Sequence, residues 1–229
     1  MTRTRELRFV ATERAGEVSG ILLQPGSARF LYVFGHGAGA GMRHPFMEAA
    51  AEGLAARGVA TLRYHFPYME AGRRGPNPRP ALVATVRAAV VEAARLLPDL
   101  PLFAGGKSMG GRMTSVAAAE GPLAGVRGLA FFGFPLHAAG RPSADRGGHL
   151  ADVGFPMLFL QGTRDNLADL DLVRPLLSNV RPAPTLHVVD GADHGFHVLK
   201  RSGRSDEEVL DEICDAFVQW AEKVAETID

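Results

Sequence analysis

The sequence predicts an α/β fold in which a mostly parallel sheet carries helices on both faces and an antiparallel hairpin at its N-terminal end. Short apolar runs alternate with longer stretches of helical periodicity along the 229 residues, which is typical of repeated strand and helix units. Residues 30–34 form a continuous apolar run that ends at Gly35, as expected of a strand covered on both faces. The alternation within residues 7–10 and 18–23, on either side of a polar turn, predicts the hairpin.

The remaining elements follow in order along the chain. After the hairpin, we expect strands over residues 30–34, 58–64, 101–104, 126–133, 156–160 and 185–189. We expect helices over residues 44–57, 82–97, 109–120, 170–177 and 206–226. Pro45 suits a first helical turn, whereas Pro98 and Gly121 end two helices. Because no repeat, linker or low-complexity tract interrupts this order, we expect one domain over residues 1–229.

Two longer connections separate these elements. Residues 66–80 are the longest stretch without periodicity, and a loop of this length is commonly functional, with a solvated surface loop as the alternative. Residues 134–150 are too few for an independent lid domain. We therefore expect a fold without a separate lid.

Composition excludes several classes of protein. The chain has 25 Lys and Arg against 25 Asp and Glu, so no global charge favours nucleic acid or a membrane as a partner. The lone Cys214 forms no internal disulfide, which indicates a reducing compartment and argues against a structural zinc site. No apolar run near the polar start is long enough for a signal peptide or membrane span. We expect a soluble cytoplasmic protein, either a monomer or a homodimer.

Ser108 lies in the segment Gly106-Lys107-Ser108-Met109-Gly110, directly after a short apolar run. This Gly-x-Ser-x-Gly frame is typical of a strand-to-helix turn that exposes a nucleophilic serine, with glycines that allow strand and helix to approach closely. A glycine-rich chain also produces such a frame by chance. A phosphate loop is a further alternative, but its spacing requires glycine where this chain has Pro101.

A second glycine-rich segment, residues 35–41, follows the strand expected at 30–34. A backbone with so few side chains can wrap closely around a ligand or an oxyanion. It also fits a loose dinucleotide fingerprint, which would indicate a Rossmann reductase. Against this alternative, no acidic residue ends the strand at 58–64 to hold a ribose hydroxyl; Arg63 leaves only an NADP version open.

Four candidate groups fall at the carboxyl ends of the expected parallel strands, where α/β sheets gather their functional residues. They are the loop at His36, Gly37 and Ala38, then Ser108, Asp165 and His194. The order Ser, Asp, His along the chain is that of an α/β-hydrolase triad.

Other residues could fill these roles. His197 is an alternative base, and His187 alternates within an apolar strand, which indicates a packed histidine. The alternative acids are Asp145, Asp152, Asp169 and Asp171. The spacing from His194 to His197 has no HExxH-like context, so we expect no metal and no cofactor.

Several strings together resemble the α/β-hydrolase superfamily, in particular its dienelactone-hydrolase-like branch. They are Gly-Lys-Ser-Met-Gly-Gly-Arg, His-Gly-Ala-Gly, Leu-Gln-Gly-Thr-Arg-Asp and Asp-His. Residues 66–70 and 200–204 are similar to a narrower family of small α/β-hydrolase-like proteins, shared by bacteria with the animal testis-expressed and NSL-complex-subunit homologues. The resemblance covers nearly the whole chain.

The resemblance implies a serine hydrolase. Ser108 would be the nucleophile, His194 the base and then the acid, and Asp165 the residue that orients the imidazole. The N–H groups of Met109 and Ala38 would bind the oxyanion. Dienelactone hydrolases use a cysteine nucleophile, so we do not expect their lactone chemistry here.

The expected substrate is a small carboxylic ester or thioester, with His36 and Gly37 beside it. Arg73 and Arg74 lie in the loop at 66–80, and three further basic residues follow His194 at 200–204. A cationic rim of these residues would favour an anionic ester, whereas a general preference for arginine in this chain is the alternative. The family also includes subunits of complexes, so a non-catalytic binding module is the second candidate function.

Overall fold

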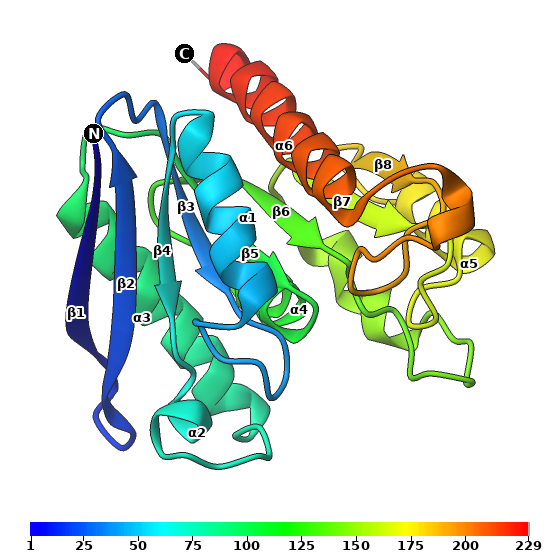
Figure 1. The fold of residues 1–229 in the computed structure, drawn as a ribbon. Coiled ribbons are helices and arrows are strands. Elements are labelled where there is room, and N and C mark those ends of the chain that lie inside the picture. Colours follow the sequence, from blue (N-terminus) through cyan, green and yellow to red (C-terminus); the bar gives the residue numbers. More distant parts are fainter. Residues whose placement is uncertain (229) are drawn as a thin grey trace.

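The computed structural model describes residues 1–228, through which one eight-stranded sheet runs (Figure 1). The strands are β1 (Thr2–Thr12), β2 (Gly16–Pro25), β3 (Phe30–Gly35), β4 (Val59–Tyr64), β5 (Leu102–Lys107), β6 (Val126–Phe132), β7 (Met157–Gly162) and β8 (Thr185–Val189). Their order is β1-β2-β4-β3-β5-β6-β7-β8. The strands from β3 to β8 pair in parallel. The hairpin of β1 and β2 is antiparallel and joins the sheet through β4.

Helices cover both faces of the sheet. They are α1 (Pro45–Ala56), α2 (Pro67–Glu70), α3 (Arg79–Leu96), α4 (Met109–Ala119), α5 (Leu170–Ser178) and α6 (Asp206–Ile228), with the 3-10 segments η1 (Asp145–Asp152) and η2 (Lys200–Ser202). In β3, Tyr32 packs in the same buried cluster as side chains of α1 and α6. Its neighbour Leu31 packs in the cluster that includes α3, α4 and α5. Successive residues of a strand point to opposite faces, so a continuous apolar run fills both layers of the core.

The predicted fold class is confirmed: the sheet is mostly parallel, has an antiparallel N-terminal hairpin and carries no separate lid domain. The hairpin strands are longer than expected, because polar residues 2–6 extend β1 by pairing with β2. The loop at 66–80 contains α2, and α3 begins at Arg79 instead of residue 82. In both helices a proline occupies the first turn, where its missing N–H costs no hydrogen bond. The assignment of residues 1–229 to one domain stays a prediction.

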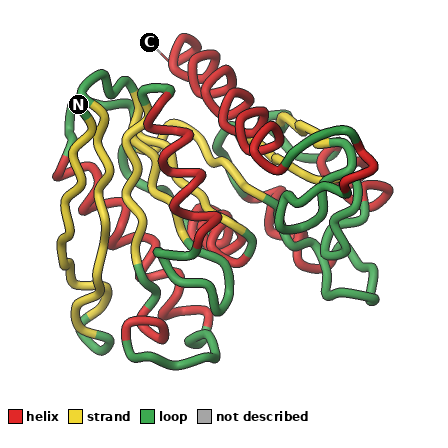
Figure 2. The backbone as a smooth tube through the Cα atoms, viewed as in Figure 1, coloured by secondary structure: helices red, strands yellow, loops and turns green. Residues whose placement is uncertain are grey.

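The loops that follow the parallel strands gather at one edge of the sheet (Figure 2). Those after β3, β5, β7 and β8 carry the four candidate groups. Among residues 1–228, no helix combines the length and the apolar character that crossing a bilayer requires.

Candidate active site

Ser108 lies between β5 and α4 in a sharp turn. Its backbone has φ 51° and ψ −117°, a left-handed conformation that non-glycine residues adopt at an energetic cost. A side chain at Gly106 or Gly110 would place Cβ 2.4 Å or 2.3 Å from the carbonyl oxygen of Gly35. Only glycine therefore lets the turn pack this closely against β3. The surrounding structure holds the serine in the strained geometry of a nucleophile elbow.

A continuous hydrogen-bonded chain joins Ser108, His194 and Asp165. Nε2 of His194 lies 2.9 Å from the Ser108 Oγ, and Nδ1 of His194 lies 2.7 Å from the Asp165 Oδ2. Because the carboxylate only accepts, Nδ1 carries the proton of the neutral ring, and Nε2 is free to accept the serine hydroxyl proton. The structure thus brings the three predicted residues into mutual contact.

Asp165 follows β7 and is held by two further donors. Its Oδ1 accepts a hydrogen bond of 2.8 Å from the backbone N–H of Leu167. Its Oδ2 also accepts a hydrogen bond of 2.5 Å from the Gln161 side chain, whose own oxygen accepts from the N–H of Phe134 at 3.0 Å. Sequence reasoning missed Gln161. The sequence signal that could have identified Gln161 is its place as a polar residue directly after the apolar run 157–160 of β7.

His194 lies in a compact turn after β8. Oδ1 of Asp193 accepts hydrogen bonds from the N–H groups of Gly195 and His197, at 2.8 Å and 3.0 Å. Phe196 has a left-handed φ of 67°, which is rare for a bulky residue and indicates a conformation imposed by its surroundings. This segment, residues 193–197, is called the histidine turn below.

The glycine-rich segment after β3, residues 36–41, lies beside Ser108 and is called the oxyanion loop below. A Cβ at Gly37 would lie 3.7 Å from the Ser108 Cβ. Within the described part of the chain, neither the N–H of Ala38 nor that of Met109 donates to another protein group. Both N–H groups are therefore available to a ligand. Clusters of three or more His, Cys, Asp or Glu side chains suited to a metal ion are absent from residues 1–228.

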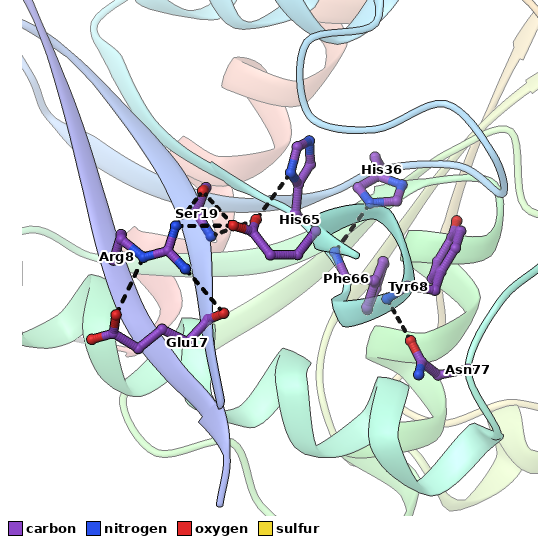
Figure 3. A network of polar contacts seen from close by, with 9 residues as sticks. Arg8, Glu17, Ser19, His36, His65, Phe66, Tyr68 and Asn77 are labelled. Carbon is purple, nitrogen blue, oxygen red and sulfur yellow. Dashed lines mark hydrogen bonds and ion pairs between the residues drawn. The ribbon is translucent and has the colours of Figure 1, made fainter. Parts of the chain in front are cut away.

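His36 is fully buried, which corrects the expectation that its side chain lies beside the substrate. Its Nδ1 donates to the Gly37 carbonyl at 2.7 Å, and its Nε2 accepts from the N–H of Phe66 at 3.2 Å. Burial lowers the pKa of His36 to about 4, so the ring stays neutral and both nitrogens remain satisfied. His36 thus ties the start of the oxyanion loop to Phe66, a contact drawn in Figure 3.

Tyr68 provides a second support for the same loop. Its hydroxyl accepts a hydrogen bond of 2.9 Å from the N–H of Gly39, and the ring is 1% exposed. The N–H of Tyr68 donates to Oδ1 of Asn77 at 2.7 Å, which fixes the start of α2 (Figure 3). Residues 66–70 were notable in the sequence only for a family resemblance, and their contact with the oxyanion loop was not predicted.

Glu70, at the end of α2, ties this support to the N-terminal hairpin. Its carboxylate accepts from the N–H and the hydroxyl of Ser19, both at 3.0 Å, and from Arg8 at 2.9 Å. Nδ1 of His65 lies 3.2 Å from the same carboxylate. Figure 3 labels the partners Arg8, Ser19 and His65. Burial favours the neutral acid, but the hydrogen bonds from Ser19, Arg8 and His65 outweigh it and keep the pKa of Glu70 below its ordinary value.

Arg73 and Arg74 are exposed in the loop after α2. The backbone N–H of Arg73 donates to the Tyr68 carbonyl at 2.7 Å. Among the described residues, neither guanidinium forms a hydrogen bond or ion pair with Ser108, Asp165 or His194. The structure therefore does not assemble these arginines with the triad.

The alternative residues occupy other positions. His197 is exposed and its Nδ1 lies 2.7 Å from Asp206, while His187 lies 2.8 Å from Glu212. Asp169 accepts from the N–H of Asp171 and caps α5. The dinucleotide alternative requires a helix that opens within the glycine loop, but α1 begins only at Pro45. Cys214 is fully buried in the core.

Comparisons with known proteins agree with the observed fold. Residues 28–222 match the family described as alpha/beta hydrolase domain. Because this match spans most of the chain, the protein belongs to the α/β-hydrolase family. The narrower resemblance to the testis-expressed and NSL-complex-subunit homologues stays a prediction.

Several solved structures share the fold. A dienelactone hydrolase from Anabaena variabilis superposes with a TM-score of 0.74 at 20% identity, over 96% of each chain. A serine hydrolase without lid from Xanthomonas campestris gives 0.73 at 19% identity, over 96% of this chain and 94% of the other. A cold-adapted esterase from an Arctic intertidal metagenomic library gives 0.68 at 20% identity, over 95% and 94%.

Proposed function

We propose that the protein is a serine hydrolase that cleaves a carboxylic ester or thioester of a small molecule through an acyl-enzyme on Ser108. The observation that carries this proposal is the hydrogen-bonded chain from Asp165 through His194 to the Oγ of Ser108. The strained backbone of Ser108 supports it, because a serine in this conformation projects from the end of its strand. The esterases and serine hydrolases among the similar structures support ester hydrolysis by analogy of fold.

In the first half of the reaction, the Ser108 Oγ attacks the carbonyl carbon while its proton moves to Nε2 of His194. The tetrahedral intermediate collapses when the imidazolium gives this proton to the leaving alcohol or thiol, which departs and leaves the acyl group on Oγ. Asp165 keeps the ring in the productive tautomer and stabilises the transient positive charge. Water then attacks the acyl carbon while Nε2 takes its proton. The second tetrahedral intermediate collapses by breaking the bond to Oγ, which releases the carboxylic acid, and the imidazolium returns the proton to Ser108.

The negative oxygen of each tetrahedral intermediate would bind the N–H groups of Met109 and Ala38. Each such donor contributes about 3 kcal/mol in comparable enzymes. Gly37 keeps the oxyanion loop close to Ser108, because it has no side chain to occupy the space in between. His36 and Tyr68 act as positioning residues for this loop.

The test is covalent labelling with a fluorophosphonate probe, with hydrolysis of small p-nitrophenyl esters and thioesters as the second measurement. The native protein should label stoichiometrically, and Ser108→Ala should abolish labelling and lower the hydrolysis rate by about 10⁴-fold or more. The matched control is Ser115→Ala, since Ser115 is buried about two helical turns further along α4 and bonds the Arg112 carbonyl and His149 instead of the triad. A native protein that does not label would identify the fold as a binding module and refute the proposal.

A further inference from the structure

Lys107 is a partly buried cation beside the nucleophile for which the reaction above has no use. It is the last residue of β5, so its side chain projects from the residue before Ser108. Its Nζ donates a hydrogen bond of 2.6 Å to the backbone carbonyl of His194. Within residues 1–228, no carboxylate forms an ion pair with this ammonium. The carbonyl of the residue proposed as the base is therefore its hydrogen-bond partner.

Two aromatic rings complete the surroundings of the ammonium. Nζ lies 5.6 Å from the centroid of Phe46 and 5.4 Å from that of Phe196, distances at which a cation is attracted to a ring face. The two rings are stacked, with centroids 5.7 Å apart and planes 13° apart. Phe196 belongs to the histidine turn and adopts its left-handed φ of 67° there. The ammonium thus contacts the histidine turn at both a carbonyl and a strained aromatic residue.

The backbone leaves room for this arrangement at Gly133, just after β6. Gly133 has φ 67°, and a Cβ there would lie 3.0 Å from the Lys107 Nζ and 3.4 Å from both the carbonyl oxygen and Nδ1 of His194. Only glycine fits such a position without displacing the lysine or the histidine. The ends of β5 and β6 and the histidine turn therefore meet around one ammonium.

From these contacts we infer that Lys107 is the positioning residue that holds His194 at hydrogen-bonding distance from Ser108. The role depends on the proposed function. Lys107 precedes Ser108 in the chain, and its side chain binds the backbone carbonyl of His194. This direct link between the end of β5 and the histidine turn maintains the distance between the Ser108 Oγ and Nε2 of His194. A misplacement of about 1 Å in such a pair costs up to about a hundred-fold in rate.

The same contacts predict a dependence on pH. Burial lowers the pKa of Lys107 to about 8, although the charges of Asp165 and Asp193 oppose this effect. The other titratable groups of the histidine turn are His194 and His197, and the latter is paired with Asp206. Above pH 8 the ammonium loses its charge, and with it the stronger hydrogen bond and the attraction to both rings. The link between Lys107 and the histidine turn should therefore weaken in alkaline solution.

The experiment measures the rate constant for fluorophosphonate labelling of Ser108 from about pH 6 to pH 10, together with the melting temperature. Lys107→Met removes the charge at similar length, and Lys107→Arg keeps a charge that does not titrate. Lys223→Met is the matched control, because Lys223 is an exposed lysine of α6. All comparisons use the full chain.

At pH 7, Lys107→Met should label about ten- to a hundred-fold more slowly than the wild type. The wild-type rate should fall above pH 8, whereas neither Lys107 variant should show this step. The melting temperature of Lys107→Met should change little, because the loss of one hydrogen bond and two ring contacts is offset by the removal of a charge whose burial disfavours the folded state. A merely structural lysine would instead lower the melting temperature in parallel with the rate.

Two results would overturn the inference. In the first, Lys107→Met labels at the wild-type rate with the wild-type pH profile. In the second, Lys107→Met labels more slowly but loses melting temperature in parallel and still shows the fall in rate above pH 8. If the native protein does not label at all, the proposed function fails and this role fails with it. If the native protein labels and Lys107→Met is unaffected, the role of Lys107 alone is refuted.

Discussion

The histidine turn and the oxyanion loop both lie beside Ser108, but different kinds of contact hold them. The histidine turn is held by charged groups of the site itself. The ammonium of Lys107 binds the His194 carbonyl, the carboxylate of Asp165 binds the His194 ring, and the carboxylate of Asp193 binds N–H groups of the turn. The oxyanion loop is held by neutral groups: its own His36 imidazole accepts from the N–H of Phe66, and the hydroxyl of Tyr68 accepts from the N–H of Gly39.

The second support continues outward from the site. Through α2 it reaches Glu70, whose carboxylate is bound to Ser19 and Arg8 of the N-terminal hairpin. The hairpin is thus part of the scaffold of the oxyanion loop. The comparison teaches that loss of a charged partner should act on the triad, whereas loss of a neutral hydrogen bond, by truncation or by protonation of a neutral group, should act on the oxyanion loop.

The largest effect should come from breaking the triad at its carboxylate. Asp165→Asn keeps the shape but offers Nδ1 of His194 a donor, which favours the wrong tautomer, and the esterase rate should fall by about 10³- to 10⁴-fold. Measurement of kcat/KM on a p-nitrophenyl ester checks this. Asp169→Asn, at the cap of α5, is the control and should stay within about three-fold of wild type. Equal losses in both variants would contradict the assignment.

Acid should act on the oxyanion side through His36. The folded protein holds the pKa of His36 at about 4, below its ordinary 6.5. The unfolded chain therefore binds this proton first as the pH falls, and His36 alone accounts for a loss of about 3 kcal/mol between pH 6.5 and pH 4. Burial lowers the pKa of His149 to about 4 as well, so this residue adds a separate loss over the same range. Urea unfolding at pH 7 and pH 4.5 measures this loss. His36→Gln does not titrate and should show a shallower dependence; an unchanged dependence would disprove the role of His36.

A smaller effect is expected when one neutral hydrogen bond to the oxyanion loop is removed. Tyr68→Phe leaves the Gly39 N–H without its acceptor, a loss of about 1 kcal/mol, or about five-fold in labelling rate. Tyr64→Phe is a close control, because the buried hydroxyl of Tyr64 has no hydrogen-bond partner among the described residues. That substitution should leave the rate unchanged. Equal rates in the two variants would show that the tyrosine contact does not position the loop.

The smallest effect concerns the preference for an anionic ester, for which the structure offers no contact between the triad and the exposed Arg73 or Arg74. Arg73→Ala should change the ratio of kcat/KM for matched anionic and neutral esters by less than about two-fold, since exposed charges are screened by solvent. A larger loss confined to the anionic ester would restore the cationic-rim hypothesis. Arg14→Ala, in the turn of the hairpin, serves as the control for net charge.

The order of the elements was predictable because it depends on local pattern. The apolar runs at β3, β5 and β7 and the periodic segments at α1, α4 and α6 carry their own signals, and each lies within a few residues of its predicted place. Ser108, Asp165 and His194 were predictable as a set, because parallel strands deliver their carboxyl ends to one edge. Their catalytic roles stay a proposal.

The supports of the site depended on residues far apart in the chain. Nothing adjacent to Tyr68 indicates that its hydroxyl meets Gly39, and nothing near Glu70 indicates Ser19 as its partner. His36 was expected beside the substrate because sequence alone does not reveal which side of a glycine loop is buried.

The sequence by itself determined the kind of fold and the edge at which the chemistry lies, because strand periodicity and glycine spacing are local properties of the chain. Only the tertiary structure decided what holds that edge in place. The ammonium of Lys107 contacts a carbonyl 87 residues away, and such a contact exists only after β5, β6, β7 and β8 have been aligned in the sheet. Which side chains meet at this edge is determined by how the helices and strands pack, and that packing depends on residues from the whole chain.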